Sequence, residues 1–113
     1  MPKHCRIAIA SDFSEVPAGR YYEDGSFTGQ RFREELLAPK LQQGYDVEID
    51  IDGVESLPSS FWEEVFGGLV RAGFESSELR RRLRVETTEP ILRRYQTLAW
   101  KFIDDQLARQ RKA

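Results

Sequence analysis

The stretch from Val47 to Gly68 constrains the fold more than any other part of the sequence, because its hydrophobic period changes in the middle. In residues 47–52 apolar and acidic residues alternate, and a period of two is typical of a strand with one apolar and one carboxylate face. After Gly53, apolar residues recur at helical spacing from Phe61 onward. The sequence therefore predicts a strand, a turn and a helix. We expect water on the carboxylate face of the strand and helices on the other face only.

Two serines stand where the predicted helix should begin, directly after Pro58. Ser60 and Glu63 have the spacing of a capping box, in which the serine oxygen accepts a hydrogen bond from the third amide of the helix and the glutamate reaches back to the amide of the serine. This interpretation makes Ser60 the N-cap of the helix and places free backbone amides around it.

The rest of the chain predicts three more strands and three more helices. The strands are expected over residues 6–10, 20–23 and 84–87, and the helices over residues 28–38, 76–83 and about 90–109. Proline and glycine separate the first two strands, so we expect an N-terminal hairpin. Thr28 is the expected N-cap of the first helix. Pro39 should end or kink that helix, because proline lacks an amide hydrogen and disfavours a helical residue before it.

This order of elements predicts an α/β fold for a single domain of residues 1–113, a length sufficient for one hydrophobic core. Strand–helix–strand connections favour parallel pairing, whereas a hairpin requires antiparallel pairing. We therefore expect a mixed sheet of about four to five strands, with helices packed on one face and the hairpin at the N-terminus.

Composition argues against several classes of protein. An apolar fraction of 40% and an aromatic fraction of 12% are typical of a folded domain, and a formal net charge of -2 gives no strong attraction to nucleic acid or membranes. Cys5 is the only cysteine, which excludes an intrachain disulfide and suits a reducing compartment. The sequence has no segment suited to a signal peptide or a membrane span, and it lacks phosphate-loop, GxSxG and zinc-ligand patterns. We expect a cytoplasmic protein without metal or cofactor.

Two blocks of the sequence support a more specific interpretation. They are GRYYEDGSFTGQRFREELLAPKL at residues 19–41 and DIDGVESLPSSFWEEVFGGLVRAG at residues 50–73. The second block has a strand that ends near Asp52 and a serine pair that opens a helix, and in this it resembles the STAS domain of anti-sigma-factor antagonists. Together the blocks resemble more specifically the bacterial STAS-like family of unknown function. This resemblance implies a STAS-like α/β fold and no catalytic activity.

In the antagonists, a kinase-like ATPase phosphorylates the second serine of the pair, and phosphorylation switches the partner. The resemblance thus implies a regulatory protein-interaction domain in which Ser60, or its neighbour Ser59, is phosphorylated. The implied switch surface around these serines comprises Asp52, Gly53, Pro58, Phe61 and Glu63. Pro58 and Phe61 stand where the antagonists have aspartate and glycine.

Ser60 therefore has two interpretations, a phosphorylated residue and a simple N-cap. The N-terminus of a helix attracts phosphate through its free amides and its dipole. Glu63 and Glu64 belong to the same first turn, however, and their charges would repel a phosphate on Ser60. On this electrostatic ground we favour the N-cap.

A second candidate site lies where the predicted hairpin meets the first helix. Arg20, Asp24 and Thr28 could line a small pocket there. Turn formation by Asp24 and capping by Thr28 explain the same residues without any ligand. We favour this second explanation.

Two clusters of charge could bind ions. Glu48, Asp50 and Asp52 share one face of the predicted strand, which suits either a hard cation or, more simply, water. A basic cluster of Arg80, Arg81, Arg82 and Arg84, with Arg93 and Arg94 nearby, could contact phosphates or form the solvated face of a short helix.

The last predicted helix has a wider apolar arc than packing on one sheet requires. The expected core stripe of this helix consists of Ile91, Tyr95, Leu98 and Phe102. Trp100, Ile103 and Leu107 extend the arc, and we expect them to form an interface with a second copy or another protein. Packing of Trp100 on its own neighbours is the alternative. A structural self-association module without switching is thus the second functional interpretation, and an enzyme or a small-ligand-binding domain is the third.

Overall fold

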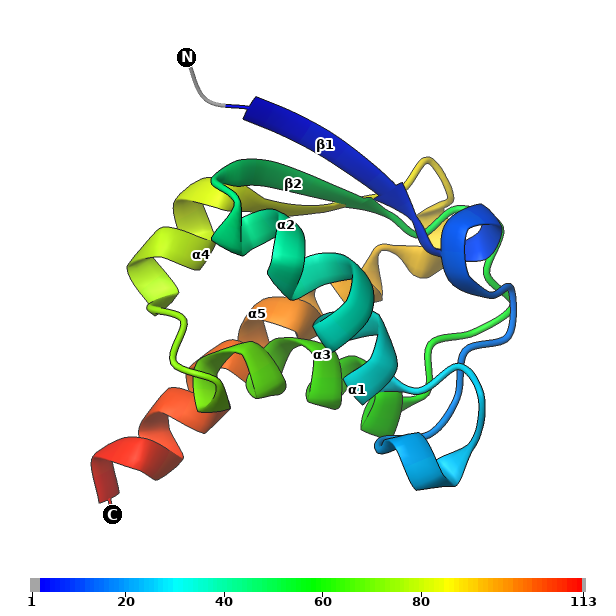
Figure 1. The fold of residues 1–113 in the computed structure, drawn as a ribbon. Helices are drawn as coiled ribbons and strands as arrows, with labels where there is room; N and C mark the ends of the chain where they lie inside the picture. Colours follow the sequence, from blue (N-terminus) through cyan, green and yellow to red (C-terminus); the bar gives the residue numbers. More distant parts are fainter. Residues whose placement is uncertain (1–2, 113) are drawn as a thin grey trace.

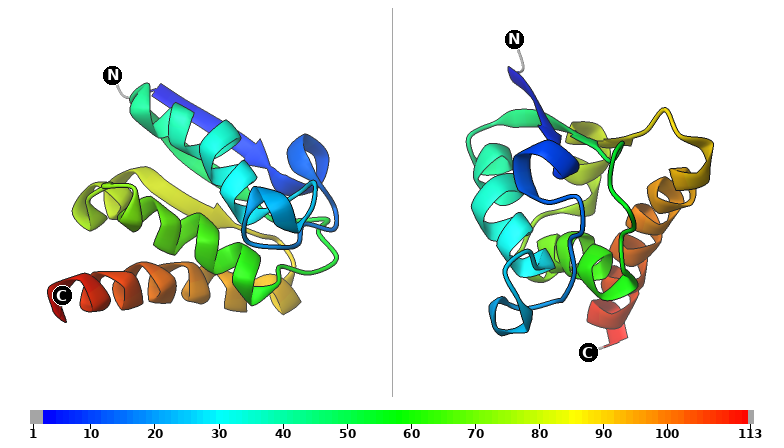
Figure 2. Two further views of the ribbon diagram at one scale, coloured as in Figure 1. Left: turned by 60° about the horizontal axis from the view of Figure 1, so that its bottom comes forward. Right: turned by 90° about the vertical axis from the view of Figure 1, so that its right-hand side faces the viewer.

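The computed structural model describes residues 3–112, in which a small parallel sheet lies against a layer of helices (Figure 1). The sheet contains β1 (Lys3–Ala8), β2 (Tyr45–Asp50) and β3 (Leu83–Glu86) in the order β1-β2-β3. Lys3 is in register with Tyr45, and Val47 with Leu83. The views in Figure 2 show the helices on one side of the sheet, so the other face is open.

The alternation in residues 47–52 places the core as expected. Val47, Ile49 and Ile51 are at most 2% exposed and face the helices. Glu48 and Asp50 point to the open face, where both contact Arg6 of β1. A parallel sheet usually has both faces covered, so this open, charged face is an unusual feature of the described residues.

The predicted hairpin and the count of four to five strands are wrong for residues 3–112, which contain three strands, all parallel. After β1 the chain turns into the short wide helix η1 (Ile9–Phe13), where the Ser14 amide donates to the Ile9 carbonyl. Residues 20–23 form no strand because the Asp24 carboxylate accepts hydrogen bonds from the amides of Arg20 and Tyr21. These amides, which a hairpin ladder would need, are used within the turn η2 (Tyr22–Asp24).

The first long helix continues through Pro39, so the expected end of the helix at this residue is wrong. It comprises α1 (Gly29–Arg31), η3 (Phe32–Leu37) and α2 (Ala38–Gln42), and Thr28 caps it as expected through a hydrogen bond from the Arg31 amide. In η3 the hydrogen bonds span five residues rather than four, as in the bond from the Ala38 amide to the Arg33 carbonyl. This wider turn lets the helix continue past a proline that lacks a donor.

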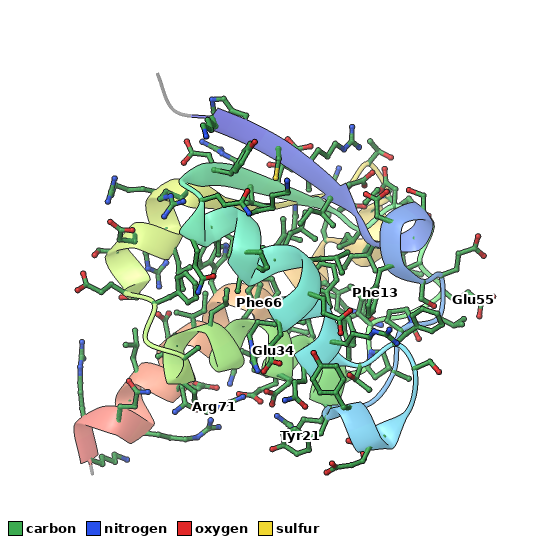
Figure 3. The ribbon with its side chains drawn as sticks, viewed as in Figure 1. Phe13, Tyr21, Glu34, Glu55, Phe66 and Arg71 are labelled. Carbon is green, nitrogen blue, oxygen red and sulfur yellow. The ribbon has the colours of Figure 1, made fainter. Side chains whose placement is uncertain are left out.

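The central helix α3 (Ser59–Arg71) is enclosed on all sides. Every residue from 61 to 70 is buried, and Phe66 lies in the interior between the helices and the sheet (Figure 3). Gly29 lets α1 cross α3 closely, since a Cβ on this residue would lie 2.5 Å from the Phe61 carbonyl oxygen. The helix ends at Arg71, and Gly73 follows the C-cap Ala72 with a φ of 103°, which favours glycine.

The last part of the chain contains α4 (Ser76–Arg82), β3, the short η4 (Pro90–Leu92) and α5 (Arg94–Lys112). α5 packs along α3 through a buried stripe of Tyr95, Ala99, Ile103 and Gln106. Among residues 3–112, every helix is too short or too polar to cross a bilayer.

Candidate functional site

The start of α3 presents both serines to solvent. Pro58 is the residue before the helix, with φ of -55°, and no side chain caps the helix there. Ser59 and Ser60 are the first two helical residues, and both are exposed. The expected N-cap role of Ser60 is therefore wrong. The fixed φ of Pro58 starts the helix earlier than the capping-box spacing indicates, and a serine inside the first turn cannot reach the amide that an N-cap binds.

The loop before α3 is fixed by the loop that follows β3. Asp52 accepts hydrogen bonds from the Thr87 hydroxyl and from the amide and hydroxyl of Thr88. These bonds lower the pKa of Asp52, because they stabilise the charged carboxylate. The amide of Gly53 donates to Glu89 at 3.1 Å. Asp52 and Gly53 thus position the approach to Ser59.

Two members of the expected switch surface are wrong, because they lie inside the protein. Phe61 is fully buried in the aromatic part of the core. The centre of the Phe13 ring lies 5.3 Å from that of Phe32 and 6.2 Å from that of Phe61. Glu63 is 8% exposed and faces the region between α3 and α5. Both are enclosed because α1 and α5 cover the sides of α3 that the sheet does not reach.

Glu63 and Glu64 form a buried cluster with three arginines, which we call the glutamate–arginine cluster: Glu63, Glu64, Arg20, Arg33 and Arg71. Arg20 contacts both carboxylates from the loop before α1. Arg71 binds Glu63 at 2.9 Å and Glu64 at 3.0 Å, and Arg33 lies 3.3 Å from Glu64. Figure 3 labels Arg71 on α3. The cluster joins α3 to η3 and to the N-terminal loop.

Burial alone would raise the pKa of Glu63. Hydrogen bonds and charge from Arg71 and Arg20 outweigh burial, so the pKa of Glu63 lies below its ordinary value. The same interaction stabilises the charged form of Arg71, whose pKa is raised first of all by its hydrogen bond to Glu63. Residue spacing does not predict this cluster, since Arg20 and Arg33 are far from the glutamates along the chain.

Arg20, Asp24 and Thr28 come close together as expected, but they bind one another and the fold. Asp24 accepts hydrogen bonds from backbone amides, and Thr28 is fully buried as the N-cap of α1. The Arg20 side chain turns to the glutamate–arginine cluster. Turn and capping chemistry therefore explains these residues, as we favoured.

Exposed apolar side chains lie on the N-terminal loop, which is bonded to the segment leading into α3. The N-terminal loop carries Val16, Tyr21 and Phe27, which are 57%, 45% and 43% exposed. Figure 3 shows Tyr21 and Glu55 at the periphery of the molecule. The amide of Glu55 donates to the Glu15 carbonyl, which holds this loop against the segment leading into α3.

The C-terminal helix turns differently from the prediction. Ile103, an expected interface residue, is fully buried against α3, and Ile91, an expected core residue, is 77% exposed. Trp100 and Leu107 are half-buried and pack against the core. Arg80 lies 5.3 Å over the Trp100 ring, so part of this tryptophan packs on its own neighbours and part remains exposed. Ile103 is buried rather than at an interface because α3 covers the side of α5 that a sheet alone would leave exposed.

The carboxylates of β2 do not converge on a cation. Asp50 binds Arg6 at 2.6 Å, and Asp52 is turned to Thr87 and Thr88. Within residues 3–112, no group of three or more histidine, cysteine, aspartate or glutamate side chains is arranged to hold a metal ion.

Comparison with known proteins identifies one family. The model of a family described as a STAS-like domain of unknown function (DUF4325) matches residues 28–91, more than half of the chain. This match covers α1 to η4 and includes the start of α3. Searches of curated proteins and of solved structures found no match.

Proposed function

The chain belongs to the family of STAS-like domains of unknown function, and on this premise we propose that it is a non-catalytic regulatory module. It binds another protein, and phosphorylation of Ser60 controls the binding. The observation that carries this proposal is the position of the Ser60 hydroxyl, which is exposed in the first turn of α3 and caps nothing.

Loss of the cap role removes the structural explanation for Ser60. The first hydrogen bond of the helix runs from the Trp62 amide to the Pro58 carbonyl. The amides before Trp62 therefore remain available to an anion at this end of α3, and the helix dipole favours negative charge there. A phosphate on Ser60 would lie in this favourable field.

The electrostatic objection to phosphorylation also loses force. Glu63 and Glu64 belong to the first turns of α3, but their carboxylates are buried and paired with Arg20, Arg33 and Arg71. Their charges are therefore neutralised within the fold and act only weakly on the exposed end of the helix.

The partner would contact the surface that surrounds Ser60. Val16, Tyr21 and Phe27 supply exposed apolar and aromatic area on the N-terminal loop, which is bonded to the segment leading into α3, and aromatic residues are enriched in protein interfaces. A kinase-like ATPase fits both roles, since it would bind this surface and modify the serine. A dianionic phosphate beside these side chains would change the affinity through charge and desolvation.

Ser77 provides a matched control for Ser60. It is also exposed, and it is also the second helical residue after a Ser-Ser opening, in α4. We expect intact-mass spectra of protein from its native cells to contain a phosphorylated species that Ser60→Ala removes and Ser77→Ala retains. Phosphopeptide maps that contain only the unmodified peptide over residues 57–64 under all growth conditions would refute the switch.

Self-association through α5 is a second proposal, favoured by the partial exposure of Trp100 and Leu107 on one side of the helix. Sedimentation of the wild type should then show a dimer, and Trp100→Ala combined with Leu107→Ser should abolish it. A wild type that remains monomeric at high micromolar concentration would exclude this proposal.

A further inference from the structure

A hollow of about 400 Å³ lies on the open face of the sheet, at the amino-terminal half of the strands. A volume of this size is within the range of small-molecule sites. The charged side chains around it come from all three strands and from α4: Arg6, Asp46, Glu48, Arg81, Arg82 and Arg84. This places three arginines of the cluster at residues 80–84 beside a fourth arginine from β1.

Arg82 is the fixed part of the hollow. Its Nη2 donates to the carbonyl oxygens of Leu41 and Tyr45, at 2.7 Å each. Its other nitrogens lie 3.6 Å from Asp46 and 3.3 Å from Glu78. The side chain is 18% exposed, so a charged guanidinium is held at the wall of the hollow in one orientation.

Arg84 is the free part of the hollow. It projects from β3 onto the open face and is exposed, and within residues 3–112 its guanidinium has no hydrogen bond or ion pair. Glu48, its neighbour in register on β2, pairs with Arg6 instead. Arg81 makes only an exposed pair with Glu78, which water weakens and a ligand can replace.

Positive charge is concentrated at this end of the sheet. Of the six charged side chains that line the hollow, four are arginines and two are carboxylates. Two further carboxylates contact these arginines from outside the lining, Asp50 at Arg6 and Glu78 at Arg81 and Arg82. The whole chain has a formal net charge of -2, so the lining of the hollow has the opposite sign to the chain as a whole.

We propose that this hollow binds a small phosphorylated molecule. Arg81 and Arg84 would hold the phosphate, because the planar guanidinium donates two hydrogen bonds to such an oxyanion. Arg82 would supply fixed charge behind it. Asp46 and Glu48 accept hydrogen bonds only, so they would bind hydroxyl groups on the remainder of the molecule. The site is distinct from the start of α3 and does not depend on the function proposed for Ser60.

Ribose 5-phosphate is a suitable probe, with ribose and inorganic phosphate as its two parts. Titrations followed by amide chemical shifts and by calorimetry should show saturable binding of ribose 5-phosphate, with shifts at residues 46–48 and 81–84. Ribose alone should not bind. Affinity should decrease as salt is added, because the contact is between exposed charges.

Arg84→Gln should weaken this binding by about tenfold or more, which is the usual effect of losing hydrogen bonds to a charged group. Arg93→Gln is the matched control, since Arg93 is exposed but lies outside the hollow, and it should leave the affinity unchanged. Unchanged melting midpoints would establish that both variants are folded.

Four results would overturn the proposal. They are the absence of saturable binding, equal weakening by Arg84→Gln and Arg93→Gln, equal affinity for inorganic phosphate and ribose 5-phosphate, and binding of a phosphoserine peptide without binding of ribose 5-phosphate. The third result would assign the hollow to the free ion, and the fourth would assign it to a protein partner.

Discussion

Replacing Glu64 with glutamine tests whether the glutamate–arginine cluster stabilises the fold. Glu64 is 4% exposed, and its carboxylate lies 3.2 Å from Arg20, 3.3 Å from Arg33 and 3.0 Å from Arg71. Glutamine keeps the shape of the side chain but removes the negative charge. Arg20 and Arg71 would then keep Glu63, and Arg33 would keep only Glu34, 3.4 Å away, whose side chain is 47% exposed.

The expected loss of stability follows from the burial of the partners. Removing one member of a buried ion pair costs about 3–5 kcal/mol, because it leaves an uncompensated charge. Arg33 is as buried as Glu64, but Arg20 and Arg71 have side chains that are 31% and 35% exposed, and water can compensate them. We therefore expect the lower limit, about 3 kcal/mol, from a total of roughly 5–15 kcal/mol for a domain of this kind.

Urea denaturation followed by the fluorescence of buried Trp62 measures this loss. With a slope of about 1.5 kcal/mol per M, the midpoint should fall by about 2 M. Glu35→Gln is the matched control, since the Arg31–Glu35 pair has side chains that are 43% and 47% exposed and should contribute less than about 1 kcal/mol. Equal midpoints for the two variants would refute the stabilising role of the cluster.

Three further predictions concern single side chains. Thr28→Ala should lower the free energy of unfolding by about 1 kcal/mol in thermal melts, because Thr28 caps α1, whereas Ser60→Ala should cost less than about 0.5 kcal/mol; a reversed order would restore the cap at Ser60. Gly29→Ala should cost about 1–3 kcal/mol in urea, since its methyl group would lie 2.5 Å from a carbonyl oxygen, and an unchanged midpoint would contradict this crossing of α1 and α3. The pKa of Glu63 is lower in the folded state than its ordinary value of 4.5, so its stabilisation is present above pH 4.5 and is lost as the pH falls through the folded pKa. Glu63→Gln should flatten the decrease of the urea midpoint below pH 4.5, and an identical acid profile would argue against this assignment.

Local patterns predicted the elements that local chemistry controls. The alternation in residues 47–52 and the cap at Thr28 are confirmed, because each depends on neighbours along the chain. The predicted hairpin is wrong because of a different local interaction. Strand propensity in residues 20–23 competes with a carboxylate at Asp24 that binds two amides within the turn, and a pattern of residue types does not show which of the two is stronger.

The candidate site was harder to predict, because its geometry depends on helices that come from other parts of the chain. Helical spacing in residues 61–70 identifies one buried face, but α1 and α5 bury the other faces as well. This enclosure turned Phe61 and Glu63 inward and left Ser59 and Ser60 as the exposed residues of the first turn. The same argument applies to Ile103, whose partner is α3 rather than a second protein.

The register of the sheet has a consequence for the order in which the chain can fold. Lys3 pairs with Tyr45 and Val47 with Leu83, so every strand pair joins residues about 40 positions apart. During synthesis β1 has no strand to pair with until β2 has emerged. The other edge of β2 stays unpaired until β3 has emerged. The helix of residues 29–42 depends mainly on bonds within itself and can form in the interval. Pairing of the three strands is therefore the late, slow step of folding. Until the strands have paired and packed on the helices, the apolar side chains of β1 and β2 are exposed to other chains.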